Sequence, residues 1–283
     1  MTAALDPVFD RPIFIVSTPR SGSTLLFETL TRAPGVYTIG GESHQLIESI
    51  PQLTIWAHGF SSNRLLAADA VPDVVAKLRR RFLVNMRDRD GNVLAPGHDR
   101  FRMLEKTPKN SLRIPFLLKA FPEARFVFLY RDPCQVLASM MEAWLSGRFK
   151  TYVGLPGWPL PYWALLLTPG WQALAGKPLA DIVAGQWQAA TTALLDDLAQ
   201  LPPGRCQTIR YGDLIADPSA QIGRLCPGLG LGWDRPIDGP LPLARHTVSR
   251  PDPEKWRVRA TEIKAVMPGL IATIERAERT VDA

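Results

Sequence analysis

The sequence predicts an α/β fold in which a parallel sheet is covered by helices on both faces. Two observations carry this prediction: short apolar runs indicate buried strands, and segments with apolar residues at helical spacing alternate with them along the chain. Strands separated by helices favour parallel pairing. Ligands of such sheets bind beyond the carboxyl ends of the strands, so polar residues that follow the apolar runs are candidate site residues.

The first part of the chain is expected to form a strand at 13–17, helices from 23, at 43–56 and at 72–87, and a polar loop at 89–100. Pro34-Gly35 ends the first helical unit. Arg79-Arg80-Arg81 lies in the third helix. We interpret this run as a solvent-exposed face, because charge runs on helices usually face water.

In the second part we expect three more strands, at 101–104, 126–130 and 206–210, and three more helices, at 110–120, 133–144 and 218–226. Residues 147–177 break the alternation, because they are rich in proline, glycine and aromatic residues and too apolar for simple disorder. So long a segment is unusual in a compact domain unless it has a function. We expect one domain over 1–283, with 147–177 as a lid-like insertion; an insert packed outside the sheet is the alternative.

Composition limits the classes of partner. The formal net charge of +6 suits an anionic small ligand, and no basic stripe interleaved with aromatic residues predicts a nucleic-acid partner. No long uncharged apolar run predicts a membrane span, and the N-terminus lacks the pattern of a signal peptide. Cys134, Cys206 and Cys226 have neither metal-ligand spacing nor a disulfide framework. We therefore expect a cytoplasmic protein without a metal.

The loop between the first strand and the first helix reads Thr18-Pro19-Arg20-Ser21-Gly22-Ser23-Thr24. Its backbone N–H groups, hydroxyls and arginine, with the positive end of the following helix, indicate an anion site. A loop that binds ATP or GTP would have a lysine directly after its last glycine, whereas Ser23 follows Gly22 here. Phosphoryl transfer from ATP is therefore disfavoured. A plain turn in which Arg20 caps a neighbour is the structural alternative.

Cations also follow two other predicted strands. Arg131 stands at the end of the strand at 126–130, and Ser139 lies two helical turns beyond it. A guanidinium can bind a phosphate through two parallel hydrogen bonds. A salt bridge between Arg131 and Asp132 is the structural alternative. Lys106 follows the strand at 101–104, so three cations at three strand ends suit a nucleotide with several separate anionic groups.

These motifs resemble those of the sulfotransferases that use 3′-phosphoadenosine 5′-phosphosulfate (PAPS). Residues 18–25 are similar to the 5′-phosphosulfate loop of that family, and residues 130–139 are similar to its 3′-phosphate element. The segments at 105–108 and 121–126 resemble the protein-tyrosine and heparan enzymes in particular. Each motif is short, but their order and their positions at strand ends are together specific.

The resemblance implies a sulfotransferase fold, which is a P-loop-like parallel sheet with helices on both faces. It also implies PAPS as cosubstrate, adenosine 3′,5′-bisphosphate (PAP) as product, and no metal. The residues that it assigns to the nucleotide are Pro19, Arg20, Ser21, Gly22, Ser23, Thr24, Arg131, Ser139, Tyr211, Lys255 and Trp256.

Catalysis of sulfuryl transfer needs cations and a base. Arg20 and Lys106 are the candidates for stabilising the charge that develops on the transferred group. Family members take the base for the acceptor hydroxyl from Glu or His, and Glu42 resembles their Gly-Glu-Glu segment with a shift of one residue. His44 and His246 are the other candidates. Glu42 as a simple helix-start residue is the structural alternative.

We therefore expect transfer of a sulfuryl group from PAPS to a hydroxyl of an apolar or aromatic small molecule, or of a carrier-bound substrate. The large aromatic residues of 147–177, among them Trp158 and Trp163, are expected to make the acceptor site apolar. A kinase or nucleotide hydrolase of the P-loop type is one alternative. A nucleotide-binding protein without catalysis is the other.

Overall fold

A computed structural model describes residues 8–94 and 100–283 of the chain. Its central sheet has the order β2-β3-β1-β4-β7, and every neighbouring pair of strands is parallel. The strands are β1 (Ile13–Val16), β2 (Val36–Tyr37), β3 (Arg102–Lys106), β4 (Arg125–Tyr130) and β7 (Cys206–Arg210). This sheet confirms the predicted fold class, and all four predicted strands belong to it.

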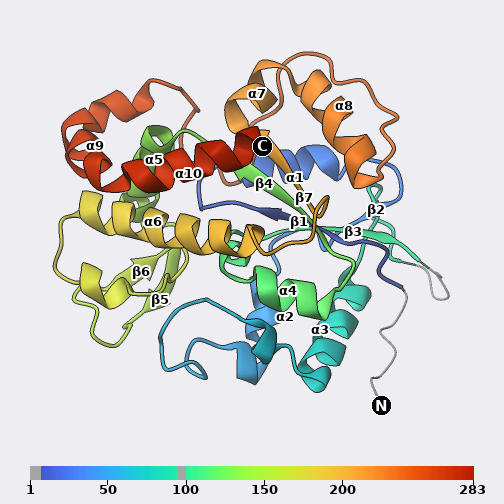
Figure 1. The fold of residues 1–283 in the computed structure, drawn as a ribbon, viewed down its shortest axis with the longest axis horizontal. Helices are drawn as coiled ribbons and strands as arrows, with labels where there is room; N and C mark the ends of the chain where they lie inside the picture. Colours follow the sequence, from blue (N-terminus) through green and yellow to red (C-terminus); the bar gives the residue numbers. More distant parts are fainter. Residues whose placement is uncertain (1–7, 95–99) are drawn as a thin grey trace.

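Helices cover both faces of the sheet (Figure 1). One face carries α1 (Ser23–Leu30), α7 (Tyr211–Ala216) and α8 (Pro218–Leu229), and the other carries α2 (His44–Glu48), α3 (Pro72–Asn85) and α4 (Ile114–Ala120). Alternate residues of each strand supply the two cores, because successive side chains of a strand point to opposite faces. Ile13 and Ile15 pack with α1 and α8, whereas Phe14 and Val16 pack with α3 and α4.

A third core lies beside the sheet, around α5 (Pro133–Ser146) and α6 (Leu179–Leu198). It is completed by the antiparallel pair β5 (Lys150–Val153) and β6 (Tyr162–Ala164), and by α9 (Ala260–Val266). The last helix is α10 (Ile271–Asp282), which packs against α6 and β7. The short 3-10 helices are η1 (Pro51–Leu53), η2 (Ala67–Asp69), η3 (Pro108–Leu112), η4 (Trp171–Leu174), η5 (Lys255–Arg259) and η6 (Met267–Leu270).

Several predicted boundaries were wrong. The helix expected at 43–56 ends at Glu48, because Pro51 cannot continue it and begins η1 instead. The strand expected at 101–104 runs to Lys106, so that residue lies in β3 rather than after it. The helix expected at 110–120 begins only at Ile114. Part of the loop predicted at 89–100, residues 95–99, lies outside the described residues, and α6, α7, α9 and α10 were not predicted.

The interpretation of the arginine run on α3 was wrong for Arg79. Its side chain is buried, with 7% of its surface exposed. The guanidinium lies over the rings of Phe9 and Phe121, at 4.7 Å and 5.4 Å from their centroids, and donates a hydrogen bond to the Ala120 carbonyl. Arg80 is exposed, as expected. Aromatic faces can hold a desolvated guanidinium, which is why a charge run does not by itself identify a solvated face.

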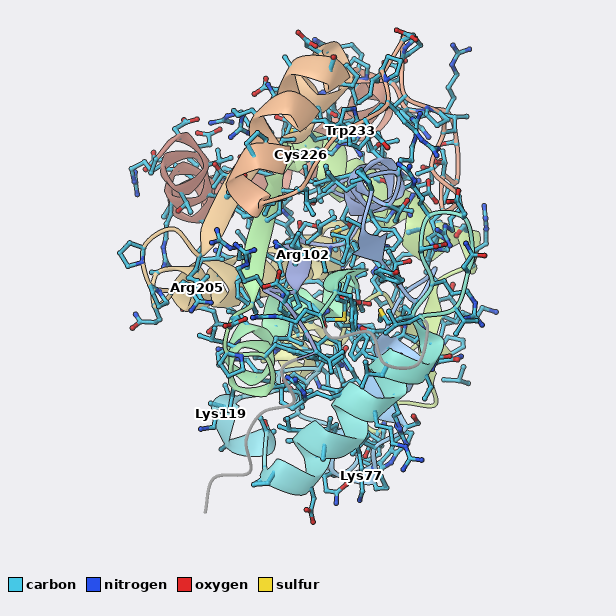
Figure 2. The ribbon with its side chains drawn as sticks, turned by 90° about the vertical axis from the view of Figure 1, so that its right-hand side faces the viewer. Lys77, Arg102, Lys119, Arg205, Cys226 and Trp233 are labelled. Carbon is cyan, nitrogen blue, oxygen red and sulfur yellow. The ribbon has the colours of Figure 1, made fainter. Side chains whose placement is uncertain are left out.

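The end of the sheet where β3 begins has its own polar contacts (Figure 2). Arg102, the first residue of β3, lies between α8, which carries Cys226, and α3, which carries Lys77. Its guanidinium donates to the Leu229 carbonyl at 2.6 Å and to Asp10 at 3.1 Å. These contacts anchor α8 to the sheet at the end opposite the candidate site.

None of the described helices combines the length and apolarity needed to cross a bilayer.

Candidate active site

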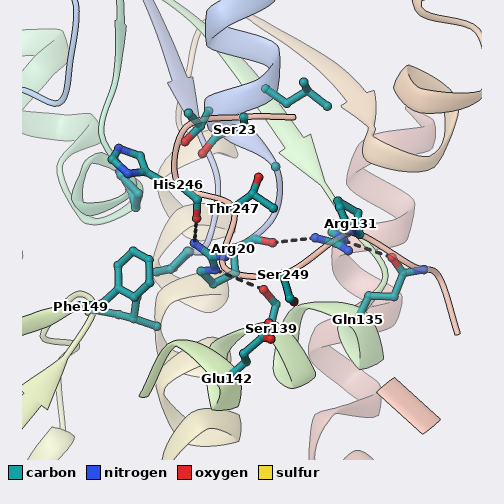
Figure 3. A pocket seen from close by; sticks show the side chains of 18 of the residues that line it. Arg20, Ser23, Arg131, Gln135, Ser139, Glu142, Phe149, His246, Thr247 and Ser249 are labelled. Atoms are coloured by element: carbon teal, nitrogen blue, oxygen red, sulfur yellow. Dashed lines mark hydrogen bonds between the residues drawn. The ribbon is translucent and has the colours of Figure 1, made fainter. Parts of the chain in front are cut away.

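A cavity of about 1140 Å³ opens at the carboxyl ends of the central strands. The loop after β1, α5, the β5 strand and the segment from residue 240 to residue 259 contribute to its walls. This position is the one that parallel α/β sheets use for ligands. Figure 3 shows the part of the cavity that contains Arg20 and Arg131, with the chain around His246 passing close to both arginines.

The loop after β1 has an unusual backbone. Arg20 has a φ of 69° and Gly22 has a φ of 98°, both in the left-handed region that side chains disfavour. A Cβ on Gly22 would come within 2.4 Å of the Tyr211 ring, so only glycine allows this approach. Ser23 and Thr24, the first residues of α1, line the cavity, and N–H groups at a helix start are suited to binding an anion.

Arg20 is held by neutral groups only. Its Nε donates to Ser139 Oγ at 3.2 Å, its Nη1 donates to the His246 carbonyl at 3.0 Å, and its guanidinium lies 4.9 Å from the centroid of the Phe149 ring (Figure 3). Burial lowers the pKa of Arg20, and the charge of Arg131 lowers it further although Glu142 opposes the shift. The guanidinium is therefore a partly desolvated cation in need of a counter-ion.

Arg131 is also held without a carboxylate. Its Nε donates to Gln135 Oε1 at 3.1 Å and its Nη1 donates to the Arg20 carbonyl at 3.0 Å, while the Tyr211 ring lies 4.4 Å beneath it. The salt bridge with Asp132 does not form, because Asp132 caps α5 by accepting from the Gln135 N–H. Burial lowers the pKa of Arg131 as well.

Two adjacent guanidinium groups thus face the cavity without an ion-pair partner among the described residues. Desolvated cations are unfavourable unless they are compensated. An anionic ligand bound in the cavity would provide the missing charge and accept their remaining N–H groups. The residues present therefore fit a phosphate-bearing nucleotide.

Lys106, at the end of β3, lies behind the cavity wall and is not among the residues that line the cavity. Its side chain is 2% exposed, and its Nζ donates to Thr24 Oγ1 at 3.0 Å and to Glu42 Oε1 at 2.5 Å. The lysine beside the first loop therefore comes from a neighbouring strand and not from the loop itself. Burial would raise the pKa of Glu42, but the neighbouring His44 imidazole and the charge of Lys106 lower it to about 2.

Glu105 fixes the chain that carries Glu42. Its carboxyl is fully buried and accepts from Ser43 Oγ and Thr107 Oγ1 at 2.6 Å each, and from Asn110 Nδ2 at 2.5 Å. The Ser43 N–H also donates to Thr107 Oγ1. Burial raises the pKa of Glu105, although the hydroxyl donors oppose the shift. Through Ser43, this network holds Glu42 opposite Lys106.

Two histidines flank the Glu42–Lys106 pair. His44 Nδ1 lies 3.6 Å from Glu42 Oε2, and the side chain of His44 is 42% exposed. His246 lines the same cavity, and burial lowers its pKa although the negative charge of Glu42 opposes the shift. A neutral imidazole therefore stands near Glu42 at neutral pH.

The other residues assigned to the nucleotide converge on the cavity as well. The structure places these residues in its wall: Pro19, Gly22, Ser23, Thr24, Ser139, Tyr211, Lys255 and Trp256. Ser21 is buried and bonds Thr18 within the loop. Lys255 is paired with Glu142 at 2.8 Å. Sequence reasoning missed Gln135 and Phe149; Gln135 was detectable one helical turn after Arg131, whereas no local signal marks Phe149.

The tryptophans of 147–177 do not have the expected position. Trp158, Trp163 and Trp171 pack edge to face with one another. Trp144 of α5 packs edge to face with Trp163 and in a tilted arrangement with Trp158, and we call these four residues the tryptophan cluster. Their exposed fractions are at most 7%, and they belong to the third core. The segment reaches the cavity through smaller pieces of chain, namely residues 148–152 and 165–166.

A parallel sheet whose strand ends carry a glycine-containing loop, two guanidinium groups without a carboxylate partner and a lysine defines an α/β protein with a cationic, P-loop-like site. A family model described as "Sulfotransferase family" matches residues 12–235, and the chain belongs to that family. The match confirms the resemblance that the motifs at 18–25 and 130–139 indicated.

Curated relatives agree with this assignment. The chain is 32% identical over 127 residues to an omega-hydroxy-beta-dihydromenaquinone-9 sulfotransferase of Mycobacterium bovis, a match that covers 45% of this chain and 28% of that protein. It is 25% identical over 224 residues to protein-tyrosine sulfotransferase A of Caenorhabditis elegans, covering 78% and 50% respectively. The chain therefore spans half or less of the length of these relatives.

The fold is shared with solved sulfotransferases. The structure of sulfotransferase STF9 from Mycobacterium avium superposes with a TM-score of 0.52 at 14% identity, over 94% of this chain and 76% of that one. At this identity the similarity concerns the fold alone, and it confirms the P-loop-like parallel sheet with helices on both faces.

Proposed function

We propose that the protein transfers a sulfuryl group from PAPS to a hydroxyl of an acceptor that is largely apolar or aromatic. Membership of the sulfotransferase family supports the reaction type. The observation that carries the proposal is the pair of guanidinium groups, Arg20 and Arg131, which face one cavity without a carboxylate partner among the described residues. PAPS has a 3′-phosphate and a 5′-phosphosulfate on the same ribose, so two cations in one cavity suit it.

Within this proposal the two arginines have different roles. Arg20 and the N–H groups at the start of α1 bind the 5′-phosphosulfate, and Arg131 with Ser139 binds the 3′-phosphate. Tyr211 positions Arg131, because its ring lies against both the guanidinium and Gly22. When bound, PAPS supplies the activated sulfuryl group.

Lys106 and Glu42 serve the transfer itself. Lys106 stabilises the negative charge that grows on the leaving oxygen, as preorganised cations do in group transfer. Glu42 accepts the proton of the acceptor hydroxyl. Its pKa of about 2 makes it a weak base while it is paired with Lys106. As the ammonium turns toward the reacting group, the loss of this pairing raises the basicity of Glu42, so proton transfer and charge development are coupled.

The segment 147–177 contributes the apolar or aromatic side chains Phe149, Leu165 and Leu166 to the cavity wall, together with the cations Arg148 and Lys150. These residues support the proposal that the segment covers the acceptor site within a single domain. The names of the relatives also fit hydroxylated acceptors with apolar or aromatic bodies: a hydroxylated menaquinone in one case and protein tyrosine in the other.

The test combines nucleotide binding with transfer. PAP is expected to raise the midpoint of thermal unfolding through mass action, and more than ATP with Mg²⁺ does. A panel of phenols and primary alcohols with labelled PAPS then measures transfer. Stabilisation by PAP with no transfer to any acceptor would favour a non-catalytic nucleotide-binding protein. A larger rise of the unfolding midpoint with ATP than with PAP would contradict PAPS as the donor.

A further inference from the structure

A second Glu–Lys pair, Glu48 and Lys109, lines the same cavity and has no part in the proposed transfer. Lys109 Nζ donates to both carboxylate oxygens of Glu48 at 2.8 Å and to Tyr152 Oη at 3.0 Å. Arg113, which is 1% exposed, donates to Glu48 Oε1 at 2.6 Å. The pair stands beside the transfer centre, since His44 and Glu48 lie on one face of α2, about 6 Å apart at Cβ.

Tyr152 has a hydroxyl proton without an acceptor among the described residues. Asn63 Oδ1 accepts from the Leu167 N–H, so the Asn63 amide must donate through Nδ2, at 2.5 Å, to Tyr152 Oη. The other neighbour of that oxygen is the Lys109 ammonium, which is also a donor. Burial and the Glu48 carboxylate raise the pKa of Tyr152, so the phenol keeps its proton at neutral pH.

Glu48 offers the complementary function. Its carboxylate is ionised, because the charges of Arg113 and Lys109 lower its pKa against the effect of burial. A carboxylate has about four lone-pair positions, and three are used by these two partners. The side chain of Glu48 is 21% exposed, and its residue lines the cavity. The Tyr152 hydroxyl, a proton donor, and the Glu48 carboxylate, with a free acceptor position, therefore belong to residues of the same cavity wall.

We propose that Glu48 and Tyr152 form a subsite for a second hydroxyl of the acceptor, apart from the hydroxyl that receives the sulfuryl group. This inference rests on the proposed function and narrows its substrate class to acceptors with at least two hydroxyls on an apolar body. A hydroxyl is the group that accepts from Tyr152 and donates to Glu48 at the same time. A carboxylate would be repelled by Glu48, and an ammonium group cannot accept from the phenol.

The experiment compares a 4-alkylphenol with counterparts that carry one hydroxyl at successive carbons of the alkyl chain. Specificity constants are measured with PAPS, and equilibrium binding of the same phenols to the PAP complex is measured by calorimetry, which needs no turnover. Tyr152→Phe keeps the ring and removes the donor. Tyr162→Phe is the matched control, because its hydroxyl, on the paired strand β6, donates to the Trp144 carbonyl instead.

The wild type is expected to prefer one hydroxylated phenol over the parent by about tenfold, or about 1.4 kcal/mol. Tyr152→Phe is expected to lose this preference and to keep the PAP-induced thermal shift, and Tyr162→Phe is expected to keep both. A wild type that prefers no hydroxylated phenol in either measurement overturns the subsite without using any variant. A preference that survives in Tyr152→Phe overturns it too. Failure to bind PAP would instead contradict the proposed function.

Discussion

Replacing Gly22 by alanine tests how the first loop, Tyr211 and Arg131 depend on one another. The new Cβ would lie 2.4 Å from two carbons of the Tyr211 ring, at a φ of +98°. Gly35 provides a matched control, because it has a φ of +70° and nothing lies within 4 Å of the position that its new methyl group would take. Both substitutions force a side chain into the left-handed region, but only the first creates a contact.

Two free-energy costs lower the stability of Gly22→Ala, and they differ in size. The left-handed backbone costs about 1 kcal/mol for alanine, partly offset by the reduced freedom of the unfolded chain. Inserting a methyl group into a packed site costs about 1–3 kcal/mol more. For a chain of this size each kcal/mol lowers the melting temperature by about 2 °C, so Gly22→Ala should melt about 2–6 °C below Gly35→Ala.

The assay is thermal unfolding of both variants with and without PAP. Because the Tyr211 ring supports the Arg131 guanidinium, displacement of the ring should also reduce the PAP-induced shift in Gly22→Ala. Gly35→Ala should respond to PAP like the wild type. Equal melting temperatures and equal PAP shifts in the two variants would refute the argument that Gly22 is required by the approach of Tyr211.

Three further predictions concern the site, and a fourth concerns the tryptophan cluster. Arg131→Ala is expected to weaken PAP binding by on the order of tenfold while adenosine 5′-phosphate affinity stays nearly constant, because its proposed contact is with the 3′-phosphate; calorimetry that finds equal losses would contradict the assignment. Glu42→Gln should keep PAP binding and lower turnover by about 10²–10⁴-fold, and an active Glu42→Gln beside an inactive His246→Ala would move the role of base to His246. Because the pKa of Glu42 is lowered from 4.5 to about 2, its charge stabilises the fold above pH 4.5 and this contribution is lost as the pH falls toward 2, so the melting temperature of the wild type should approach that of Glu42→Gln over this range. Trp163→Ala should lower the free energy of unfolding by about 3–5 kcal/mol and leave PAP affinity unchanged, since Trp163 is fully buried in the tryptophan cluster; unchanged stability with a raised acceptor KM would return Trp163 to the acceptor site.

The central sheet was predictable because its signals are local. A strand buried on both faces must be apolar at successive positions, and the run at 13–16 has this pattern whatever surrounds it. The loop at 18–24 was readable for the same reason, since its glycine, hydroxyls and arginine are adjacent in the chain. Pro51 likewise ends α2 by its own chemistry, and that signal was overlooked.

Tertiary structure alone decided which charges are compensated. Arg79 and Arg131 are both arginines beside apolar segments, yet the first is held between two aromatic rings and the second faces the cavity without an ion-pair partner among the described residues. The tryptophans of 147–177 could have faced either a core or a cavity, because both environments favour large apolar groups. The contacts of Trp158 and Trp163 with Trp144 of α5 place them in a core, and the sequence contains no sign of these contacts.

The pairs Glu42–Lys106 and Glu48–Lys109 also show what local sequence determines and what depends on the tertiary structure. The sequence determined that a glutamate and a lysine would lie near the strand ends, because strand-end positions follow from the local apolar pattern. Which carboxylate meets which ammonium depends on residues about sixty positions apart, brought together when α2 packs beside the end of β3. Such contacts are set by the packing of whole elements, and the free energy of a charge depends on every group around it, so local sequence determined the elements and the tertiary structure determined the electrostatics of the site.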